Sequence, residues 1–379
     1  MSNYKNNTNQ KIENKEKIKN NLNEKEIIIK YIEEIKNEKT RIRAIKNLSK
    51  YIEKNQNLAE YLWYSTGTVA AILQEIIKIY QYLSPPKLTQ EKSNEACAAI
   101  SLFQCLASHN EIRHKFIESK LPIFLYPFLS NIYKSNPYEY IKLRTLGVIG
   151  ALVKFDDSKV ISFLIDTEIF PLCLRILERG TELSKCVACF IVLRIVLNDV
   201  GFKYIFKKEK RLYFITQILG VVLKSKINHR LLKYILRIFA RLSENKETRN
   251  ILRNILPEEI KNDKLFCILD DSSKKWIKIL KKNLEENDIV TDTKIEKLKN
   301  DLSNKNDNIK NIYIVNKNND NKTNLNNGEM INHNNKNFNL ILMNQMIQKK
   351  SINQQNCNDI NYFNVNNNYI NKSNYNKFK

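Results

Sequence analysis

Glycine and proline are scarce in this chain of 379 residues, which contains only seven of each. No proline occurs before Pro85 or after Pro257. Tight turns depend on these two residue types, because glycine adopts backbone conformations that other residues avoid and proline fixes one of them. A sheet protein of this length would need more of both, so the composition favours an all-α fold.

Long apolar runs are also missing, since no stretch reaches the roughly 18 to 20 residues that a membrane-spanning helix needs. We expect no signal peptide at the start of the chain. The seven cysteines are an odd number and form no dense framework. Most lie in apolar helical runs, where a free cysteine behaves as a small hydrophobic residue. We therefore predict a protein without membrane contact in a reducing compartment, the cytoplasm, with the nucleus also open.

Positive charge is abundant, since 63 lysines and arginines against 40 acidic residues give a formal net charge of +23. Such an excess raises the affinity for any polyanion. Much of it is lysine scattered among asparagine and isoleucine, so solvated lysine-rich faces explain it better than a clustered nucleic-acid patch. Direct binding of RNA or single-stranded nucleic acid stays open as the alternative function.

One pattern recurs between residues 26 and 285: an apolar helix, a short polar break and a further helix. The breaks align at Asn110, Asp157, Asp199 and Asn245, at intervals of 47, 42 and 46 residues. This spacing is typical of armadillo or HEAT units. Each unit has an apolar face that it cannot bury alone, so stacked units share one core. We predict a right-handed armadillo-repeat solenoid of about five or six helical units.

The clearest unit runs from Tyr140 to Leu177, where three helical segments alternate with short breaks. Its first segment contains Gly147 and Gly150, and such small residues let a second helix approach closely. The pair lacks the third glycine and the preceding strand of a phosphate-binding loop. We therefore interpret this segment as a packing helix.

Both ends of the chain differ in composition from the predicted repeats. Residues 1–25 are rich in asparagine and lysine, and 28 of the 79 residues from Asp301 to Lys379 are asparagine. Such segments bury too little apolar surface to offset the entropy of ordering, so we predict disordered tails at 1–25 and 286–379. One apolar island, Phe338 to Ile347, is better explained by chance than as a docking motif, although such islands can fold on binding.

No constellation of residues indicates catalysis, a metal or a cofactor. Cys186 and Cys189 have CxxC spacing, but they lie in a predicted helix, and no second pair follows at zinc spacing. The acidic pairs at Asp156–Asp157 and Asp270–Asp271 lie at helix starts, where a carboxylate caps free backbone amides. We predict a binding protein that is not an enzyme and needs no cofactor and no metal.

Several blocks of this sequence, in the right order, resemble one known family. They are YLWYSTGTVAAILQEI (Tyr61–Ile76), LTQEKSNEACAAISLFQCLASHNEIR (Leu88–Arg113), LPIFLYPFLS (Leu121–Ser130), LGVIGALVKFDD (Leu146–Asp157), TEIFPLCLRILERGTELSK (Thr167–Lys185) and RLLKYILRIFARLSENKETR (Arg230–Arg249). The resemblance covers roughly Leu58 to Leu284. The family is the Rcd type ("required for cell differentiation"), the armadillo-repeat Caf-forty subunit of the Ccr-Not mRNA deadenylase complex.

The resemblance implies a non-catalytic adaptor that docks on the scaffold subunit of the Ccr-Not complex. Its partners would be mRNA-regulatory proteins with short linear motifs, and it would promote deadenylation, decay and translational repression. It implies two pockets for tryptophan side chains, whose positions match Pro137, Tyr140, Leu143, Gly147, Cys186, Val187 and Arg211. It also implies a groove for helical motifs, whose positions match Tyr64, Thr66, Ala70 and Ile77. Self-association into a homodimer stays open.

Elementary physics makes the tryptophan pockets reasonable. Gly147 leaves room beside Tyr140, Leu143 supplies an apolar wall, and Arg211 can stack on an indole ring. Burying about 150 to 250 Å² per tryptophan at about 25 cal/mol per Å² gives at most roughly 4 to 6 kcal/mol before ordering costs. Useful affinity therefore needs two pockets that share one flexible ligand.

The chain also departs from the family at both predicted surfaces. Arg144 and Cys186 replace small polar residues around the pockets, and Glu209 stands where the family has a tyrosine. In the helical-motif groove, Tyr64 replaces a histidine and Thr66 an aromatic residue. These changes indicate a different set of partners.

Overall fold

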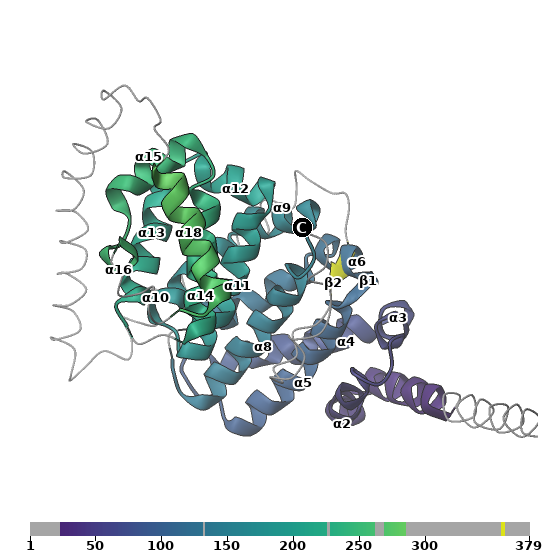
Figure 1. Ribbon diagram of the computed structural model, residues 1–379. Helices are drawn as coiled ribbons and strands as arrows, with labels where there is room; N and C mark the ends of the chain where they lie inside the picture. Colours follow the sequence, from purple (N-terminus) through teal and green to yellow (C-terminus); the bar gives the residue numbers. More distant parts are fainter. Residues whose placement is uncertain (1–22, 132, 226–227, 262–268, 286–357, 361–379) are drawn as a thin grey trace, which may run out of the picture. The chain divides into compact units, whose positions relative to one another are not determined.

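The computed structural model describes residues 23–131, 133–225, 228–261, 269–285 and 358–360. The predicted tails lie almost entirely outside the described residues, as does the apolar island Phe338–Ile347. Nearly all regular structure in the described part of the chain is helical, which confirms the all-α prediction (Figure 1). The chain divides into two compact units, with the boundary between Thr167 and Glu168.

Unit 1 contains the described residues up to Thr167, apart from Ser84–Pro86, together with the strand at 358–360. After a helix over residues 23–36, its helical elements are α2 (Glu38–Leu48), η1 (Ser49–Tyr51), α3 (Leu58–Tyr64), α4 (Thr68–Ile77), η2 (Lys78–Tyr82), α5 (Gln90–Leu106), α6 (Ile112–Glu118), η3 (Leu121–Leu125), α7 (Tyr126–Ser130), α8 (Asn136–Leu152) and α9 (Ser158–Asp166). A short strand, β1 (His109–Glu111), pairs antiparallel with β2 (Asn358–Ile360).

Unit 2 contains the remaining described helices. They are α10 (Ile169–Arg179), α11 (Glu182–Leu197), α12 (Asp199–Phe206), α13 (Glu209–Leu223), α14 (His229–Leu242), α15 (Lys246–Ile255), α16 (Glu258–Lys261) and α18 (Asp271–Glu285). The three segments predicted between Tyr140 and Leu177 correspond to α8, α9 and α10, so that prediction is confirmed.

Groups of three helices that end in a long one recur along the described part of the chain. The helices that end the groups are α5, α8, α11, α14 and α18, which have between 14 and 17 residues. In unit 1, α5 packs against α8, and in unit 2, α14 packs against both α11 and α18. Five such groups agree with the predicted five or six units, and their shared apolar faces form the core of each unit.

Side-chain caps begin most helices that follow the polar breaks. Asp157 caps α9, and Asn245 caps α15, each accepting hydrogen bonds from two backbone amides of the first turn. Asn198 caps α12, so the capping residue of that break lies one position before the aligned Asp199. Asn110 differs, since it lies in β1 and α6 begins without a side-chain cap.

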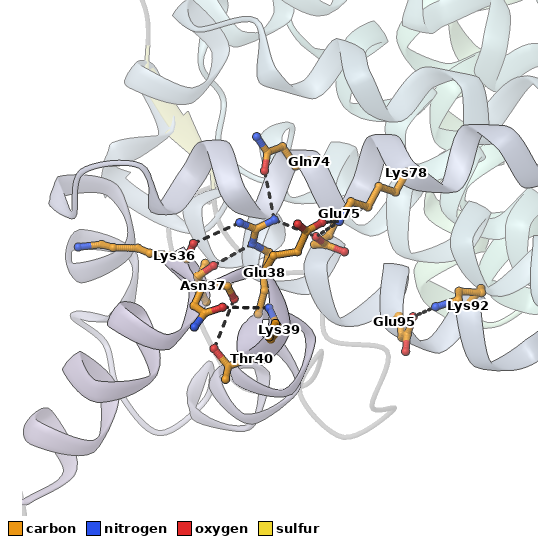
Figure 2. A network of polar contacts seen from close by, with 12 residues as sticks. Lys36, Asn37, Glu38, Lys39, Thr40, Gln74, Glu75, Lys78, Lys92 and Glu95 are labelled. Atoms are coloured by element: carbon orange, nitrogen blue, oxygen red, sulfur yellow. Dashed lines mark hydrogen bonds and ion pairs between the residues drawn. The ribbon is translucent and has the colours of Figure 1, made fainter.

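A buried ion pair fixes one side of α4 against α2. Arg41 Nη1 lies 3.2 Å from Glu75 Oε1, and both side chains are only 9% exposed. The same nitrogen donates a hydrogen bond to Gln74 Oε1, and Figure 2 shows Gln74 and Glu75 at this network. Lys78 Nζ extends the network with ion pairs of 2.9 Å to Glu75 and Glu38. This anchoring holds α4 in place while another side of it faces solvent.

Candidate peptide-binding surfaces

The four residues predicted for the helical-motif groove lie close together in the sequence of unit 1, and all four are exposed. Tyr64 is the last residue of α3, Thr66 lies in the turn, and Ala70 and Ile77 belong to α4. The turn depends on Gly67, whose φ of +80° is a conformation that residues with a side chain rarely adopt. The Tyr64 ring is 61% exposed, which is unusual for so large an aromatic side chain.

An apolar stripe runs along the exposed side of α4. Ala70, Leu73 and Ile77 recur at spacings of three and four residues, which places them on one side of the helix. Ile72 and Ile76, on the other side, are completely buried in the core. We call Ala70, Leu73 and Ile77 the α4 stripe. Its smallest member, Ala70, allows a second helix to approach closely.

Lys115 of α6 lies beside this surface and was missed by the sequence analysis. Its Nζ is 4.7 Å from the centre of the Tyr64 ring, and it donates a 2.6 Å hydrogen bond to Tyr64 Oη. The two residues are 51 positions apart in the chain, and no local pattern links them. Only the packing of α6 against α3 brings them together.

Four residues predicted for the tryptophan pockets follow one another along α8 in unit 1. Pro137, Tyr140, Leu143 and Gly147 are spaced by three or four residues, which is the spacing of one helix face. The Tyr140 ring is 47% exposed, whereas Pro137 and Leu143 are half-buried and Gly147 is buried. The accessible part of this surface is therefore centred on Tyr140.

The space beside Gly147 is already occupied on the side of α5. A Cβ atom on Gly147 would lie 3.1 Å from Gln104 Oε1 and 3.5 Å from Gln104 Cδ. The Gln104 side chain is buried in the α5–α8 interface. The absence of a side chain at Gly147 thus allows α5 and α8 to pack closely, in agreement with the interpretation of this segment as a packing helix.

Arg144 lies one turn after Tyr140 on α8 and is half-buried. Burial raises the pKa of the Cys97 thiol to about 11, while the positive charge of Arg144 acts in the opposite direction. This coupling places Arg144 near Cys97 of α5. Arg144, which departs from the family pattern, is four residues after Tyr140 and therefore places a positive charge on the same side of α8.

The other three predicted pocket residues belong to unit 2. Cys186 and Val187 lie in α11, buried and half-buried, and Arg211 lies in α13. The guanidinium carbon of Arg211 is 3.6 Å from the centre of the Tyr204 ring, and its Nη1 donates a 2.7 Å hydrogen bond to the Tyr204 carbonyl. Arg211 is thus already stacked on an aromatic ring of its own unit. The seven predicted residues divide between the two units.

The CxxC pair is part of the apolar core of unit 2. Cys186 and Cys189 are buried free thiols of α11, and burial raises the pKa of both. Packing therefore explains them, as their helical context predicted. Across the described ranges, no group of three or more histidine, cysteine or acidic residues could hold a metal ion. Within the same ranges, no helix combines the length and apolarity required of a membrane span.

A basic and aromatic surface lies where α14 packs on α18 in unit 2. The guanidinium carbon of Arg237 is 5.0 Å from the centre of the Trp276 ring, and Lys275 Nζ is 6.0 Å from it. The lysines of α18 are Lys274, Lys275, Lys278, Lys281 and Lys282. Cations beside an accessible aromatic ring are typical of surfaces that bind single-stranded nucleic acid.

The recurring groups of three helices define a helical-repeat protein of the armadillo type. A computationally designed armadillo repeat protein for modular peptide recognition matches with a TM-score of 0.51 and 13% identity, over 68% of this chain and 100% of that one. A designed armadillo repeat protein in complex with the peptide (KR)4 matches with a TM-score of 0.50 and 12% identity, over 68% and 99%. At such low identity these matches show the fold alone.

The chain belongs to the Rcd1-like cell differentiation family, whose model matches residues 31–284. The cell differentiation protein rcd1 of Schizosaccharomyces pombe is 42% identical over 269 residues, which cover 70% of this chain and 95% of that protein. Protein CAF40 of Saccharomyces cerevisiae is also 42% identical, over 237 residues that cover 60% of this chain and 62% of that protein. The family resemblance drawn from the sequence blocks is confirmed.

Proposed function

We propose that this protein is a non-catalytic adaptor subunit of the Ccr-Not deadenylase complex. In this role it docks on the scaffold subunit and binds short motifs of regulators, which promotes deadenylation, decay and translational repression of bound mRNAs. Its site of action is the cytoplasm, and the nucleus where regulators recruit the complex there. Membership of the Rcd1-like family supports the proposal.

The observation that carries the proposal is the exposed α4 stripe with Tyr64 at its end. Accessible apolar residues in a row on one helix, here the exposed Ala70 and Ile77 with the half-buried Leu73 between them, suit an amphipathic partner helix, which lays its own apolar face along them. Ala70 is small enough for such a helix to come close, and Leu73 and Ile77 supply apolar contact. The buried Arg41–Glu75 pair keeps α4 rigid, which lowers the ordering cost of binding.

The Tyr140 surface is a second binding site in this proposal, for tryptophan-containing segments. An indole ring packs against the exposed Tyr140 side chain and the half-buried Leu143 of unit 1, while Arg211, in unit 2, belongs to the other predicted pocket. Each contact alone is weak, so affinity comes from two tryptophans on one flexible chain.

Affinity purification of the full chain from its native cells, followed by mass spectrometry, tests the adaptor role. We expect the wild-type chain to recover a large scaffold subunit and a deadenylase. Ala70→Arg should lose a set of regulators while retaining the scaffold, because it blocks the α4 stripe without touching the core. Gln81→Arg places the same charge on an exposed residue of η2 and serves as the control. Recovery of neither scaffold nor deadenylase by the wild-type chain refutes the proposal.

The basic surface on α14 and α18 favours a second candidate function, direct binding of single-stranded RNA. Trp276 offers a ring on which a base can stack, and the neighbouring Arg237 and Lys275 can neutralise phosphates. RNA affinity should then fall steeply with added salt, because phosphate contacts release counterions. Lys278→Glu should weaken binding and reduce the salt dependence. A salt-independent affinity would rule this function out.

A further inference from the structure

A half-buried cation, Lys115 of α6, lies beside the exposed Tyr64, which ends α3. Lys115 Nζ lies 4.7 Å from the Tyr64 ring centre and donates its 2.6 Å hydrogen bond to Tyr64 Oη. Tyr64 itself is 61% exposed, so the pair faces solvent. Tyr64 ends α3, and only the short turn at Gly67 separates it from the first turn of α4. The cation is therefore held beside Tyr64, one of the four residues predicted to contact a partner helix.

Among the described residues of unit 1, Lys115 forms no ion pair with a carboxylate, in contrast to other lysines there. Lys78 pairs with Glu38 and Glu75, and Lys142 pairs with Glu139 at 3.0 Å. In the part of the chain that the structure describes, no carboxylate lies within 4.0 Å of Lys115 Nζ. One acid is nearby, since burial raises the pKa of Glu118 while the charges of Lys159 and Lys115 oppose that shift. The Glu118 carboxylate therefore interacts electrostatically with Lys115, but it lies too far from Nζ to form an ion pair.

The chemistry of the pair fits a carboxylate. Tyr64 Oη accepts the hydrogen bond of Lys115, which leaves the phenolic proton free to donate to another group. The ammonium group keeps two further N–H donors. A carboxylate placed beside them gains charge-assisted hydrogen bonds from both side chains.

We propose that the α4 stripe takes an amphipathic helical motif that carries an aspartate or glutamate, and that this carboxylate pairs with Lys115 and Tyr64. The inference rests on the proposed adaptor function and states the chemistry of its partner. Apolar side chains of the motif lie on Ala70, Leu73 and Ile77, and the acidic residue selects among motifs that share this apolar face.

Charge complementarity also decides against the chain's own apolar island as the occupant. From Lys336 to Lys350 the sequence contains no aspartate or glutamate and includes Lys349 as well. A segment with three lysines and no acid gains nothing from Lys115 and is repelled by it. The occupant is therefore a separate protein with an acidic motif.

Selection from a library of 16-residue helical peptides on the immobilised full chain tests this inference. Every peptide has leucine at positions spaced i, i+3, i+4 and i+7, and the flanking positions vary among Asp, Glu, Asn, Gln, Lys and Ser. On the wild-type chain we expect acidic residues to be enriched about fivefold at one flanking position, as for an accessible ion pair. Lys115→Glu should reverse this preference to lysine, and Lys115→Met should abolish it.

The controls separate this inference from the adaptor proposal. Lys87→Glu makes the same charge change at an exposed lysine of unit 1 and should leave the acidic preference intact. The inference is wrong, and the α4 binding site stands, if the selected peptides bind wild type, lose binding on Ala70→Arg and show no preference for acidic residues. If no selected peptide depends on Ala70, both the inference and the α4 binding site are wrong. Urea unfolding of each variant confirms that loss of binding is not loss of folding.

Discussion

Replacing Gly147 with leucine should destabilise the protein, because the space beside Gly147 is filled from within unit 1. Even the first side-chain atom would lie 3.1 Å from Gln104 Oε1, and a leucine extends well beyond that atom. Forcing extra methylene groups into a packed interface typically costs about 1 to 3 kcal/mol. Glycine is a poor helix former, so the substitution recovers up to about 1 kcal/mol of helix propensity. We expect a net loss of about 1 to 2 kcal/mol.

A double-mutant cycle in urea unfolding of the full chain measures the contact. Gln104→Ala removes the side chain that a new residue at position 147 would meet, so the double variant should recover about 1 kcal/mol of the loss. A leucine at position 147 that leaves the unfolding free energy unchanged, or a cycle without coupling between the two sites, refutes the reasoning.

The contact between Gly147 and Gln104 also determines which variant is suited to binding experiments. Tyr140 is 47% exposed, so Tyr140→Ala removes the accessible ring of the predicted tryptophan surface and changes the core little. A bulky residue at Gly147 alters folding and binding together. Tyr140→Ala should therefore abolish binding of a two-tryptophan peptide while the urea midpoint stays near that of wild type, and a large fall in the midpoint would contradict this.

Three further predictions concern stability and reactivity. Glu75→Gln removes the buried partner of Arg41 and should lower the unfolding free energy by about 3 kcal/mol, whereas the exposed Glu38→Gln should change it little in the same urea assay. Burial lowers the pKa of His114 against the opposing charge of Asp157, 3.4 Å away, so the unfolded chain binds its proton first as the pH falls; stability should decline below about pH 6.5, and His114→Gln should flatten the decline. Burial raises the pKa of Cys173 to about 12, so its thiol should resist alkylation at pH 7.5 until urea is added, and rapid labelling of the native chain would contradict its burial.

The repeat architecture could be predicted from the sequence because its signals are local. The interval between polar breaks and the helical spacing of apolar residues require no knowledge of distant contacts. The cap Asp157 was predicted for the same reason, since a capping side chain bonds to amides two or three residues away, and Asn245, predicted only as a polar break, caps α15 in the same way. At the third break the cap of α12 is Asn198, one position before the aligned Asp199, because either residue type caps well.

The candidate sites could be predicted only in part. The family resemblance supplied Tyr64, Ala70 and Ile77, and their exposure agrees with a binding role. The family resemblance did not indicate Lys115, because no local sequence pattern links it to Tyr64. Only the packing of α6 on α3 brings the two residues together. The resemblance also could not tell that Gln104 fills the space beside Gly147.

By itself the sequence determined the helical class, the repeat and the family, because composition, period and block order are properties of the chain alone. Which side of each helix stays exposed was decided only by tertiary structure. Burial and long-range pairing depend on neighbours that are distant in sequence, as the 51-residue separation of Tyr64 and Lys115 illustrates. The tertiary structure therefore decided that Gly147 is a packing residue and that the cation of Lys115 lies beside Tyr64.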